Sequence, residues 1–365
     1  MASNQFGNLF RITTWGESHG KGYGVVIDGC PANLPLTEEE INTALALRQP
    51  ARNPYVSPRN EPDQAHIFSG VYEGKTTGTP LSIIIFNQDA DSSKYEPIKD
   101  LLRPGHANFT YLKKYGIFDH RGGGRSSARE TVCRVAAGAV ARKLLAYYGV
   151  EIVAYTKQIA EISIGEIDLC DLKGLRQSIY DSPLFCPNPN ATEQMIALLN
   201  KVKEEGDSLG GIIEAAALHL PIGLGDPVYE KLEANLAKAM LSIPATRGIE
   251  FGSGFKCANM RGSLHNDRFT LDENKNIITK TNHSGGTLGG ISTGMPLVLR
   301  VPFKPTSSIA RPQETLNLEG QEQMLHMPQG SRHDPCVTIR AVPVVEAMLA
   351  LVLADAYLMH RSSQL

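Results

Sequence analysis

Residues 120–149, HRGGGRSSARETVCRVAAGAVARKLLAYYG, carry the strongest structural signal in the chain. Small and apolar residues recur there at helical spacing, and Ser127 followed by Glu130 predicts a capping box in a first turn that begins at Ser126. Gly149 predicts the end of the helix. Three consecutive glycines cost backbone entropy on folding, so the bare backbone just before this helix requires a reason.

The residues around the glycines are strongly basic. Residues 101–134 contain seven lysines and arginines against two acidic residues. The first amides of a helix are unpaired donors at the positive end of its dipole, and they form a ready anion site. The stretch therefore predicts a pocket for a small, highly anionic ligand. A tight loop with solvated arginines and an RGG-type RNA contact are the alternatives, and the formal net charge of −2 disfavours RNA.

Three other stretches combine glycine or proline with residues that transfer protons or bind anions. They are TTWGESHGKGYG with His19, RPGHANFTYLKKYG with His106, and GSRHDPCVTIRAVPVVE with Asp334. A loop histidine can act as a proton donor near neutral pH, although a lone histidine is more often only a hydrogen-bonded loop residue. The charged residues of the third stretch could equally form a surface ion pair before a helix.

The rest of the chain alternates irregularly between helix and strand signals. Further helices are predicted within residues 36–49 (with a Thr37–Glu40 capping box), 191–206 and 227–244, and after Pro343. Strands are predicted within residues 80–86, 150–164, 210–223 and 295–303. This order favours an α+β fold over a doubly wound parallel sheet. No segment has the composition of a linker, so we expect one domain over residues 1–365, with long Gly- and Pro-rich functional loops.

The composition excludes several classes of protein. Six scattered cysteines without a C-x-x-C pair predict reduced thiols, and the histidines show no metal-binding spacing. The N-terminus lacks the apolar core of a signal peptide. The apolar run at residues 341–360 is interrupted by Glu346 and Asp355, which predicts a buried helix and not a membrane span. We therefore expect a cytoplasmic protein with no membrane or nucleic-acid partner and no metal.

Together the motifs resemble the chorismate synthase family over nearly the whole chain. The matching stretches are GESHGKGYG (16–24), KYGIFDHRGGGRSSARET (114–131), NHSGGTLGGISTG (282–294), KPTSSI (304–309) and RHDPCVTIRAVPVVEAM (332–348). Motifs of this length, in this order, are specific.

The resemblance implies a reaction, a cofactor and a fold. The reaction is the 1,4-anti elimination of phosphate from 5-enolpyruvylshikimate 3-phosphate, which gives chorismate in the shikimate pathway of aromatic amino acid biosynthesis and makes the enzyme a carbon–oxygen lyase. It requires reduced FMN without net redox. The implied fold is a β-α-β sandwich, with helices between antiparallel sheets, assembled as a homotetramer. Phosphates and carboxylates on substrate and flavin are the anions that the basic glycine loop suits.

The resemblance also implies roles for individual residues. His19 protonates the departing phosphate, His106 stabilises the reduced flavin, and Asp334 works with the flavin in removing the C6 proton. The implied flavin contacts are Arg125, Ser126, Ser127, Gly289, Lys304, Pro305, Thr306, Ser307, Ser308 and Arg332. The candidates for binding substrate anions or NADPH are Arg48, Arg129 and Arg340.

Two departures from the family pattern affect these assignments. Pro54 stands where many relatives have a second arginine, and Pro244 stands where some have an amide. Relatives that reduce their own flavin carry inserted sequence that is not evident here, so we expect an external flavin reductase, with NADPH as an indirect reductant. The alternative function is an FMN- or phosphate-binding protein without catalysis, which intact His19, His106 and Asp334 disfavour.

Overall fold

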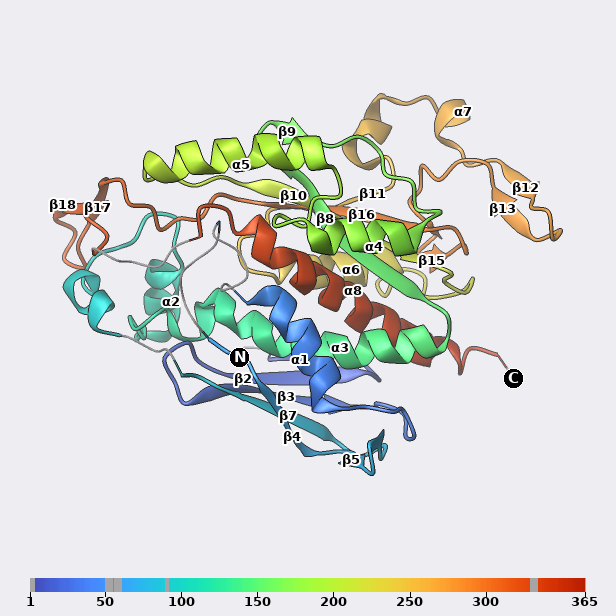
Figure 1. Ribbon diagram of the computed structural model, residues 1–365, viewed down its shortest axis with the longest axis horizontal. Helices are drawn as coiled ribbons and strands as arrows, with labels where there is room; N and C mark the ends of the chain where they lie inside the picture. The colour runs from blue at the N-terminus through green and yellow to red at the C-terminus, as the bar shows by residue number, and fades with distance from the viewer. Residues whose placement is uncertain (1–3, 50–54, 56–60, 89–91, 329–333, 365) are drawn as a thin grey trace.

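The structure is a computed structural model that describes residues 4–49, 55, 61–88, 92–328 and 334–364. Two five-stranded antiparallel sheets enclose a layer of long helices (Figure 1). The fold is therefore α+β, with helices between antiparallel sheets, as predicted.

The first sheet contains strands from the N-terminal quarter of the chain, in the order β1-β2-β3-β7-β4. Their bounds are Gln5–Phe6 (β1), Arg11–Gly16 (β2), Gly22–Asp28 (β3), Ala65–Ser69 (β4) and Leu81–Phe86 (β7). Alternate residues of β7, namely Leu81, Ile83 and Ile85, are buried. This alternation is that of a sheet with one face on the core. A small hairpin, β5 (Val71–Tyr72) and β6 (Lys75–Thr76), extends from its edge.

The second sheet has the order β11-β16-β10-β8-β9. Its strands are Glu151–Ile159 (β8), Ile162–Ser163 (β9), Gly211–Leu218 (β10), Glu250–Phe251 (β11) and Leu297–Phe303 (β16). Helices α4 (Leu172–Asp181) and α5 (Pro189–Glu204) cover its outer face and form a second apolar cluster with it. Because β8 and β10 are covered on both faces, they are buried along most of their length.

The helical layer between the sheets consists of α1 (Glu38–Arg48), α3 (Thr131–Tyr147), α6 (Leu232–Leu241) and α8 (Thr338–His360). Helices α3 and α8 cross closely at Gly138, where an added Cβ would lie 2.4 Å from the Cβ of Ala347. Within the described part of the chain, α8 alone is long and apolar enough to span a membrane, but 78% of its most apolar window is buried inside the protein. It is a core helix, as the sequence predicts.

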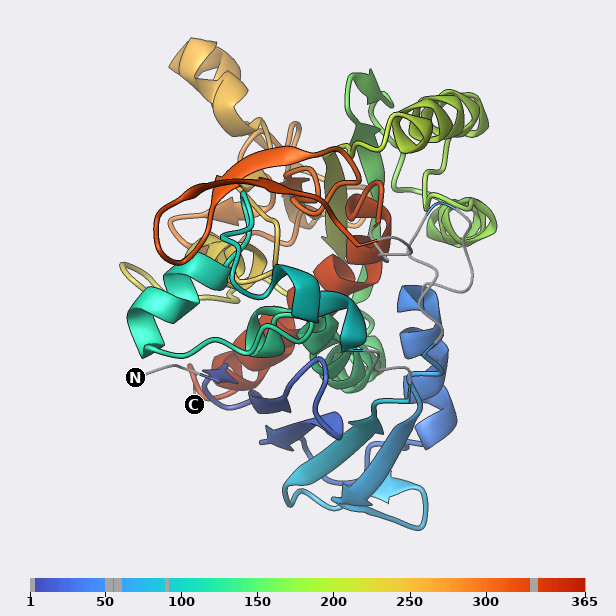
Figure 2. The ribbon, with the colours of Figure 1, turned by 90° about the vertical axis from the view of Figure 1, so that its left-hand side faces the viewer.

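Smaller elements lie at the two ends of the sandwich. One end carries α2 (Asn108–Tyr115), a 3-10 helix at Ser93–Ile98 and the hairpin β17 (Gln313–Leu316) and β18 (Glu322–Leu325), close to where α3 and α8 begin (Figure 2). The other end carries a protruding arm with a 3-10 helix (Gly254–Asn259), α7 (Gly262–His265), β12 (Phe269–Leu271) and β13 (Ile277–Thr279). A further hairpin joins β14 (Thr287–Leu288) to β15 (Ile291–Ser292).

Several sequence-based boundaries need correction. The capping box of α1 is confirmed, with both of its hydrogen bonds formed. The capping box at Ser127 and Glu130 is wrong: α3 begins at Thr131, after 3-10 turns at Gly124–Ser126 and Ala128–Glu130. The last helix begins at Thr338, five residues before Pro343, and therefore includes this proline in its second turn.

Candidate functional site

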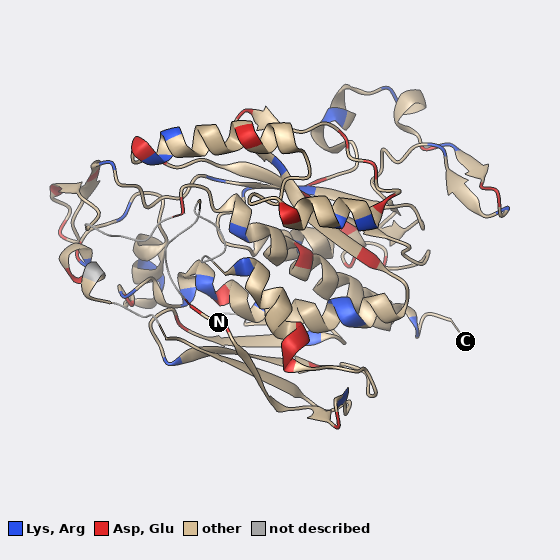
Figure 3. Cartoon of the chain, in the orientation of Figure 1, with Lys and Arg blue, Asp and Glu red and all other residues tan. Residues whose placement is uncertain are grey.

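A cavity of about 900 Å³ opens at the end of the sandwich where α3 and α8 begin. Six basic side chains line it against two acidic ones, Glu130 and Asp334. The basic residues are Arg103, Arg125, Arg134, Lys238, Arg247 and Lys304. Figure 3 shows Lys and Arg gathered around α2 and the start of α3. The cavity is therefore positively charged in a protein of net charge −2.

Part of this positive charge has no acidic partner among the residues that the structure describes. Among the described residues, no carboxylate lies within 4 Å of Arg103, Lys238, Arg247 or Lys304 in an ion pair. Burial, and then the nearby charge of Arg247, lower the pKa of Lys304, and burial lowers the pKa of Arg103. A bound anion would relieve both effects, so the cavity suits an anionic ligand.

The three glycines form the wall between two histidines. Gly122, Gly123 and Gly124 have φ angles of 66°, 86° and 54°, a left-handed conformation that favours glycine. A Cβ on Gly122 would lie 2.4 Å from the His19 ring, and one on Gly123 would lie 3.7 Å from the His106 ring. The packing against His19 therefore requires glycine at position 122, whereas the 3.7 Å contact at Gly123 is an ordinary one. The predicted direct passage from the glycines into an α-helix is wrong, because two 3-10 turns intervene.

His106 follows a turn at Gly105 and lines the cavity. Its Nδ1 accepts a hydrogen bond of 3.2 Å from the Asn108 amide, so the neutral ring carries its proton on Nε2. The ring edge also contacts Phe118, with 6.2 Å between ring centres. These contacts fix both the tautomer and the orientation of the ring.

His19 lies in the loop between β2 and β3. Its ring meets the ring of Tyr95 edge-on, with 5.5 Å between their centres. His19 is not among the residues that line the cavity, but Tyr95 and Gly122, which it contacts, are. It therefore lies directly behind the cavity wall.

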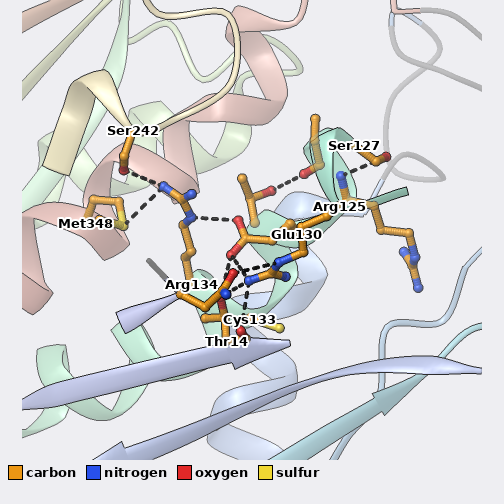
Figure 4. A network of polar contacts seen from close by, with 12 residues as sticks. Thr14, Arg125, Ser127, Glu130, Cys133, Arg134, Ser242 and Met348 are labelled. Carbon is orange, nitrogen blue, oxygen red and sulfur yellow. Dashed lines mark hydrogen bonds and ion pairs between the residues drawn. The ribbon is translucent and has the colours of Figure 1, made fainter. Parts of the chain in front are cut away.

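Glu130 holds two of the cavity's arginines (Figure 4). Its carboxylate accepts hydrogen bonds from Arg134 Nε (2.8 Å) and the Thr14 hydroxyl (2.9 Å), and it lies 3.7 Å from Arg125. Arg125 also donates to the carbonyl of Thr14 at 2.9 Å, and Arg134 donates to Ser242 at 2.7 Å. The carboxylate that the sequence predicts as a helix cap is therefore an anchor of the cavity floor.

The segment after β16 supplies polar groups to the same cavity. Lys304 donates to the carbonyl of Gly105 at 3.3 Å, and the Ser308 hydroxyl accepts a hydrogen bond from Arg103. The Thr306 hydroxyl is buried and has no hydrogen-bond partner among the described residues. A buried hydroxyl without a partner is costly, and a ligand in the cavity could pair with it.

Asp334 lines the cavity just before α8 begins. It accepts a hydrogen bond of 3.1 Å from Arg340, whose Nε is buried without a hydrogen-bond partner in the described part of the chain. Arg340 lies behind Asp334 and is not a lining residue. Arg332 and Pro54 lie outside the described residues.

The structure brings most of the predicted site residues together. Those that line the cavity are His106, Arg125, Ser126, Ser127, Lys304, Pro305, Thr306, Ser307, Ser308 and Asp334. Those that do not line it are His19, Arg48, Arg129, Gly289 and Arg340. Gly289 lies in the turn between β14 and β15. Pro244 does line the cavity, where it offers no side-chain donor. No cluster of metal-ligating side chains occurs in residues that the structure describes.

Arg48 and Arg129 are buried among protein partners. Arg48 donates to Asp63 (3.0 Å) and Thr131 (3.0 Å), and burial lowers its pKa to about 10. Arg129 donates to Asp63 (2.7 Å) and to Asn87 (2.7 Å). Their predicted role in ligand binding remains a prediction.

Sequence reasoning gave no individual role to five prominent cavity residues, although it counted Arg103 among the basic residues of the predicted anion pocket. They are Tyr95, Arg103, Tyr111, Lys238 and Arg247. Arg103 and Tyr111 lie inside the quoted RPGHANFTYLKKYG stretch, so its basic and aromatic content could have indicated them. Lys238 and Arg247 come from a helix and a loop that lie more than one hundred residues after this stretch. No local sequence pattern indicates them.

Comparison with known proteins gives a consistent result. A family model described as chorismate synthase matches residues 10–358. A chorismate synthase of Protochlamydia amoebophila is 60% identical over the full length of both chains. A chorismate synthase of Methanococcoides burtonii is 49% identical, covering 97% of this chain and 96% of its own. A crystal structure of chorismate synthase is similar with a TM-score of 0.76 and 35% identity, over 97% of this chain and 92% of the other.

Proposed function

The chain belongs to the chorismate synthase family of enzymes, and from that premise we propose that it converts 5-enolpyruvylshikimate 3-phosphate into chorismate by 1,4-anti elimination of phosphate. The observation that carries the proposal is the single cavity of about 900 Å³, which collects ten predicted site residues and a surplus of positive charge. A substrate with one phosphate and two carboxylates, together with a flavin phosphate, matches that charge. The proposed class is carbon–oxygen lyase.

The residues present fit reduced FMN. The volume suits a flavin, and the unpartnered Thr306 hydroxyl offers a buried hydrogen-bonding group in the cavity wall. Arg125, Ser126, Ser127 and residues 304–308 would hold the flavin. When bound, reduced FMN would supply electron density to the reaction without net oxidation.

The chain's own residues transfer the protons and stabilise the charge that develops on the departing phosphate. His19 donates a proton to the departing phosphate oxygen, and the unpaired cationic side chains stabilise the charge on that group. His106, oriented by Asn108, places a proton donor at the cavity wall. Asp334, held by Arg340, accepts the C6 proton whose bonding electrons enter the new double bond as the carbon–oxygen bond breaks.

The proposal extends to the protein's surroundings. It includes a cytoplasmic location, an external flavin reductase that uses NADPH, and a homotetramer. Gly289 lies outside the cavity of a single chain. Its contact with flavin therefore requires a second copy of the chain or another flavin position.

An anaerobic assay tests the function directly. Purified protein mixed with reduced FMN and 5-enolpyruvylshikimate 3-phosphate should produce chorismate, detected by its absorbance, while oxidised FMN should give none. With oxidised FMN and NADPH as the sole reductant, turnover should appear only after a flavin reductase is added. If reduced FMN binds but no chorismate forms, the chain is a flavin-binding protein without catalysis.

A further inference from the structure

Asn87 lies beside the loop that carries His19. It is the first residue after β7, whose Phe86 pairs with Gly22 at the start of β3. The Asn87 backbone amide donates to the carbonyl of Lys21 at 3.1 Å, which continues the pairing by one residue. The sheet register therefore brings the Asn87 side chain to residues 17–21, the loop between β2 and β3.

The Asn87 side chain crosslinks this loop. Its amide nitrogen lies within hydrogen-bond distance of the carbonyl oxygens of Gly20 (2.8 Å), Glu17 (3.0 Å) and Ser18 (3.3 Å). These carbonyls surround His19 in the sequence. On the other side of the loop, the Ser18 amide donates to the carbonyl of Gly124 at 3.3 Å. The histidine is therefore held between β7 and the glycine wall of the cavity.

Arg129 fixes the orientation of Asn87. Its Nε donates to Asn87 Oδ1 at 2.7 Å, so the side-chain oxygen faces the guanidinium and the nitrogen faces the loop. Arg129 is itself held by Asp63 at 2.7 Å and Glu61 at 3.5 Å. These three side chains are only 5%, 0% and 1% exposed.

Charge balance makes this support rigid. Asp63 also binds Arg48 at 3.0 Å, so two buried guanidinium groups face two buried carboxylates. Breaking such a cluster would leave an uncompensated buried charge, which is strongly unfavourable. Within it, Arg129 Nε and Nη1 are held by Asn87 and Asp63, while Nη2 is buried without a hydrogen-bond partner among the described residues.

We propose that Asn87 is a positioning residue for His19, and that Arg129 supports this role by holding the side-chain oxygen of Asn87. The proposal rests on the proposed function, in which His19 donates a proton. The loop needs such support because it lies between Gly16 and Gly22 and makes one internal backbone hydrogen bond, from Gly20 to Glu17 at 3.1 Å. A displacement of about 1 Å in a catalytic group can cost on the order of 10²-fold in rate.

The substitution Asn87→Asp isolates the donor function of the amide. It keeps the shape and the oxygen that faces Arg129, but it replaces the donor with an oxygen that repels the three carbonyls. We expect kcat to fall by about 10- to 100-fold, with KM and FMN affinity within about 2-fold of the original values. Unchanged turnover would overturn the proposal, and so would a rise in KM that accounts for the whole loss.

Asn188→Asp is the matched control. Asn188 caps α5, where its oxygen accepts a hydrogen bond from the Ala191 amide at 2.9 Å. Aspartate caps helices as well as asparagine does, so this variant should keep full activity. It makes the same chemical change at a distance from the cavity.

A double variant shows whether Asn87 acts through His19. In a His19→Ala background, Asn87→Asp should cause no further loss of turnover, because the group it positions is already absent. If Asn87→Asp slows both backgrounds by the same factor, its effect is independent of His19 and the proposal is wrong.

Nuclear magnetic resonance separates this proposal from the proposed function. The His19 ring signal, assigned by its loss in His19→Ala, should shift in Asn87→Asp and stay in place in Asn188→Asp. This holds even if the wild-type protein makes no chorismate, which would refute the function alone. An unmoved His19 signal would refute the positioning role. Should Asn87→Asp fail to fold, Asn87→Ala removes the same donor without adding a charge.

Discussion

At the scale of single residues, the two histidines have distinct surroundings. His106 lines the cavity and packs toward Gly123, whereas His19 lies behind Gly122 and against Tyr95. A general acid that acts on a leaving phosphate and a group that acts on a flavin ring need different neighbours. The geometry therefore supports separate roles for the two rings.

Replacing each histidine by alanine should separate these roles. His19→Ala and His106→Ala should each slow turnover by about 10²–10⁴-fold, the usual contribution of one acid or base. His106→Ala should also change the absorbance spectrum of bound reduced flavin, because its ring lines the cavity, while His19→Ala should leave that spectrum unchanged. Identical spectra for the two variants would contradict separate roles.

Asp334 offers a second test at this scale. Asp334→Asn keeps an oxygen for Arg340 but cannot accept a proton. We expect normal binding of FMN and substrate, a loss of about 10²-fold or more in turnover, and a larger isotope effect for substrate deuterated at C6. Turnover near that of the wild type would mean that Asp334 serves only as the ion-pair partner of Arg340.

The sequence predicts many of the residues that line the cavity, because they lie in short motifs that can be recognised in the sequence. It cannot predict that Arg48 and Arg129 share one buried carboxylate, that of Asp63. Their shared partner, Asp63, follows Arg48 by 15 residues and precedes Arg129 by 66. Such pairing depends on the register of separate elements, which no local pattern records.

At the scale of elements, the glycine loop determines where His19 lies. Gly122 and Gly116 both have left-handed backbones, with φ of 66° and 73°. A Cβ on Gly122 would meet the His19 ring at 2.4 Å, whereas one on Gly116 would meet nothing within 4 Å. Substitutions at these two glycines therefore separate the effect of backbone strain from the effect of contact with the histidine.

Alanine at these two positions should have unequal effects. Both variants should lose about 1–2 kcal/mol of folding free energy from the left-handed conformation, measured by urea unfolding. Only Gly122→Ala should also reduce kcat, by about 10-fold or more, because it displaces His19. Equal losses of activity in the two variants would show that strain, and not the contact with His19, is responsible.

The arm at the other end of the molecule is held by one carboxylate. Asp267 accepts hydrogen bonds from the His283 amide (2.8 Å), the Ser284 amide (2.9 Å) and the Thr281 hydroxyl (2.6 Å). Partial burial raises the pKa of Asp267, but these hydrogen bonds outweigh it and lower the pKa to about 2. The ionised form is therefore the one that stabilises the arm.

The stability that Asp267 provides should depend on pH. Because its folded-state pKa lies below the ordinary value of 3.8, the contribution is complete above about pH 5 and is lost as the pH falls toward 2. Asp267→Asn should lower the melting temperature at pH 6, and its difference from the wild type should shrink toward pH 2. A difference that stays constant over this range would exclude ionisation as the cause.

Elements with regular patterns are the ones that the sequence predicts well. Strands β7, β8, β10 and β16 are β-branched runs between glycines or prolines, and they lie where predicted. For the segment of β2 and β3, the glycines and the histidine predict a loop that binds a ligand, whereas the structure has a hairpin there. The segment contains both structures, because the two strands are joined by the loop that carries His19.

At the scale of the whole molecule, composition predicts an α+β protein but not its layers. The two sheets are assembled from pairings such as β10 with β16, nearly a hundred residues apart. Only the family resemblance predicts that the helices lie between the two sheets. Composition does not predict the cavity either, because its lining comes from segments scattered between residues 4 and 348.

The positive field of this cavity contrasts with the net charge of −2 on the whole protein, which suggests a test of where charge matters. Lys304→Gln and Lys280→Gln each remove one positive charge, but only Lys304 lines the cavity. With inorganic phosphate as the probe, Lys304→Gln should weaken binding by about 10-fold, the effect of losing one charged hydrogen bond, while Lys280→Gln should not change it. Added salt should weaken wild-type binding more than that of Lys304→Gln, because screening acts on the charge that the variant has lost.

Burial and Arg247 hold the pKa of Lys304 below its usual 10.5, and a bound dianion would raise it. Binding therefore takes up a proton, and wild-type affinity should fall as the pH rises toward 10.5 while that of Lys304→Gln changes less. If the two variants bind phosphate equally and with the same salt dependence, the charge of Lys304 in the cavity does not contribute to attracting the anion.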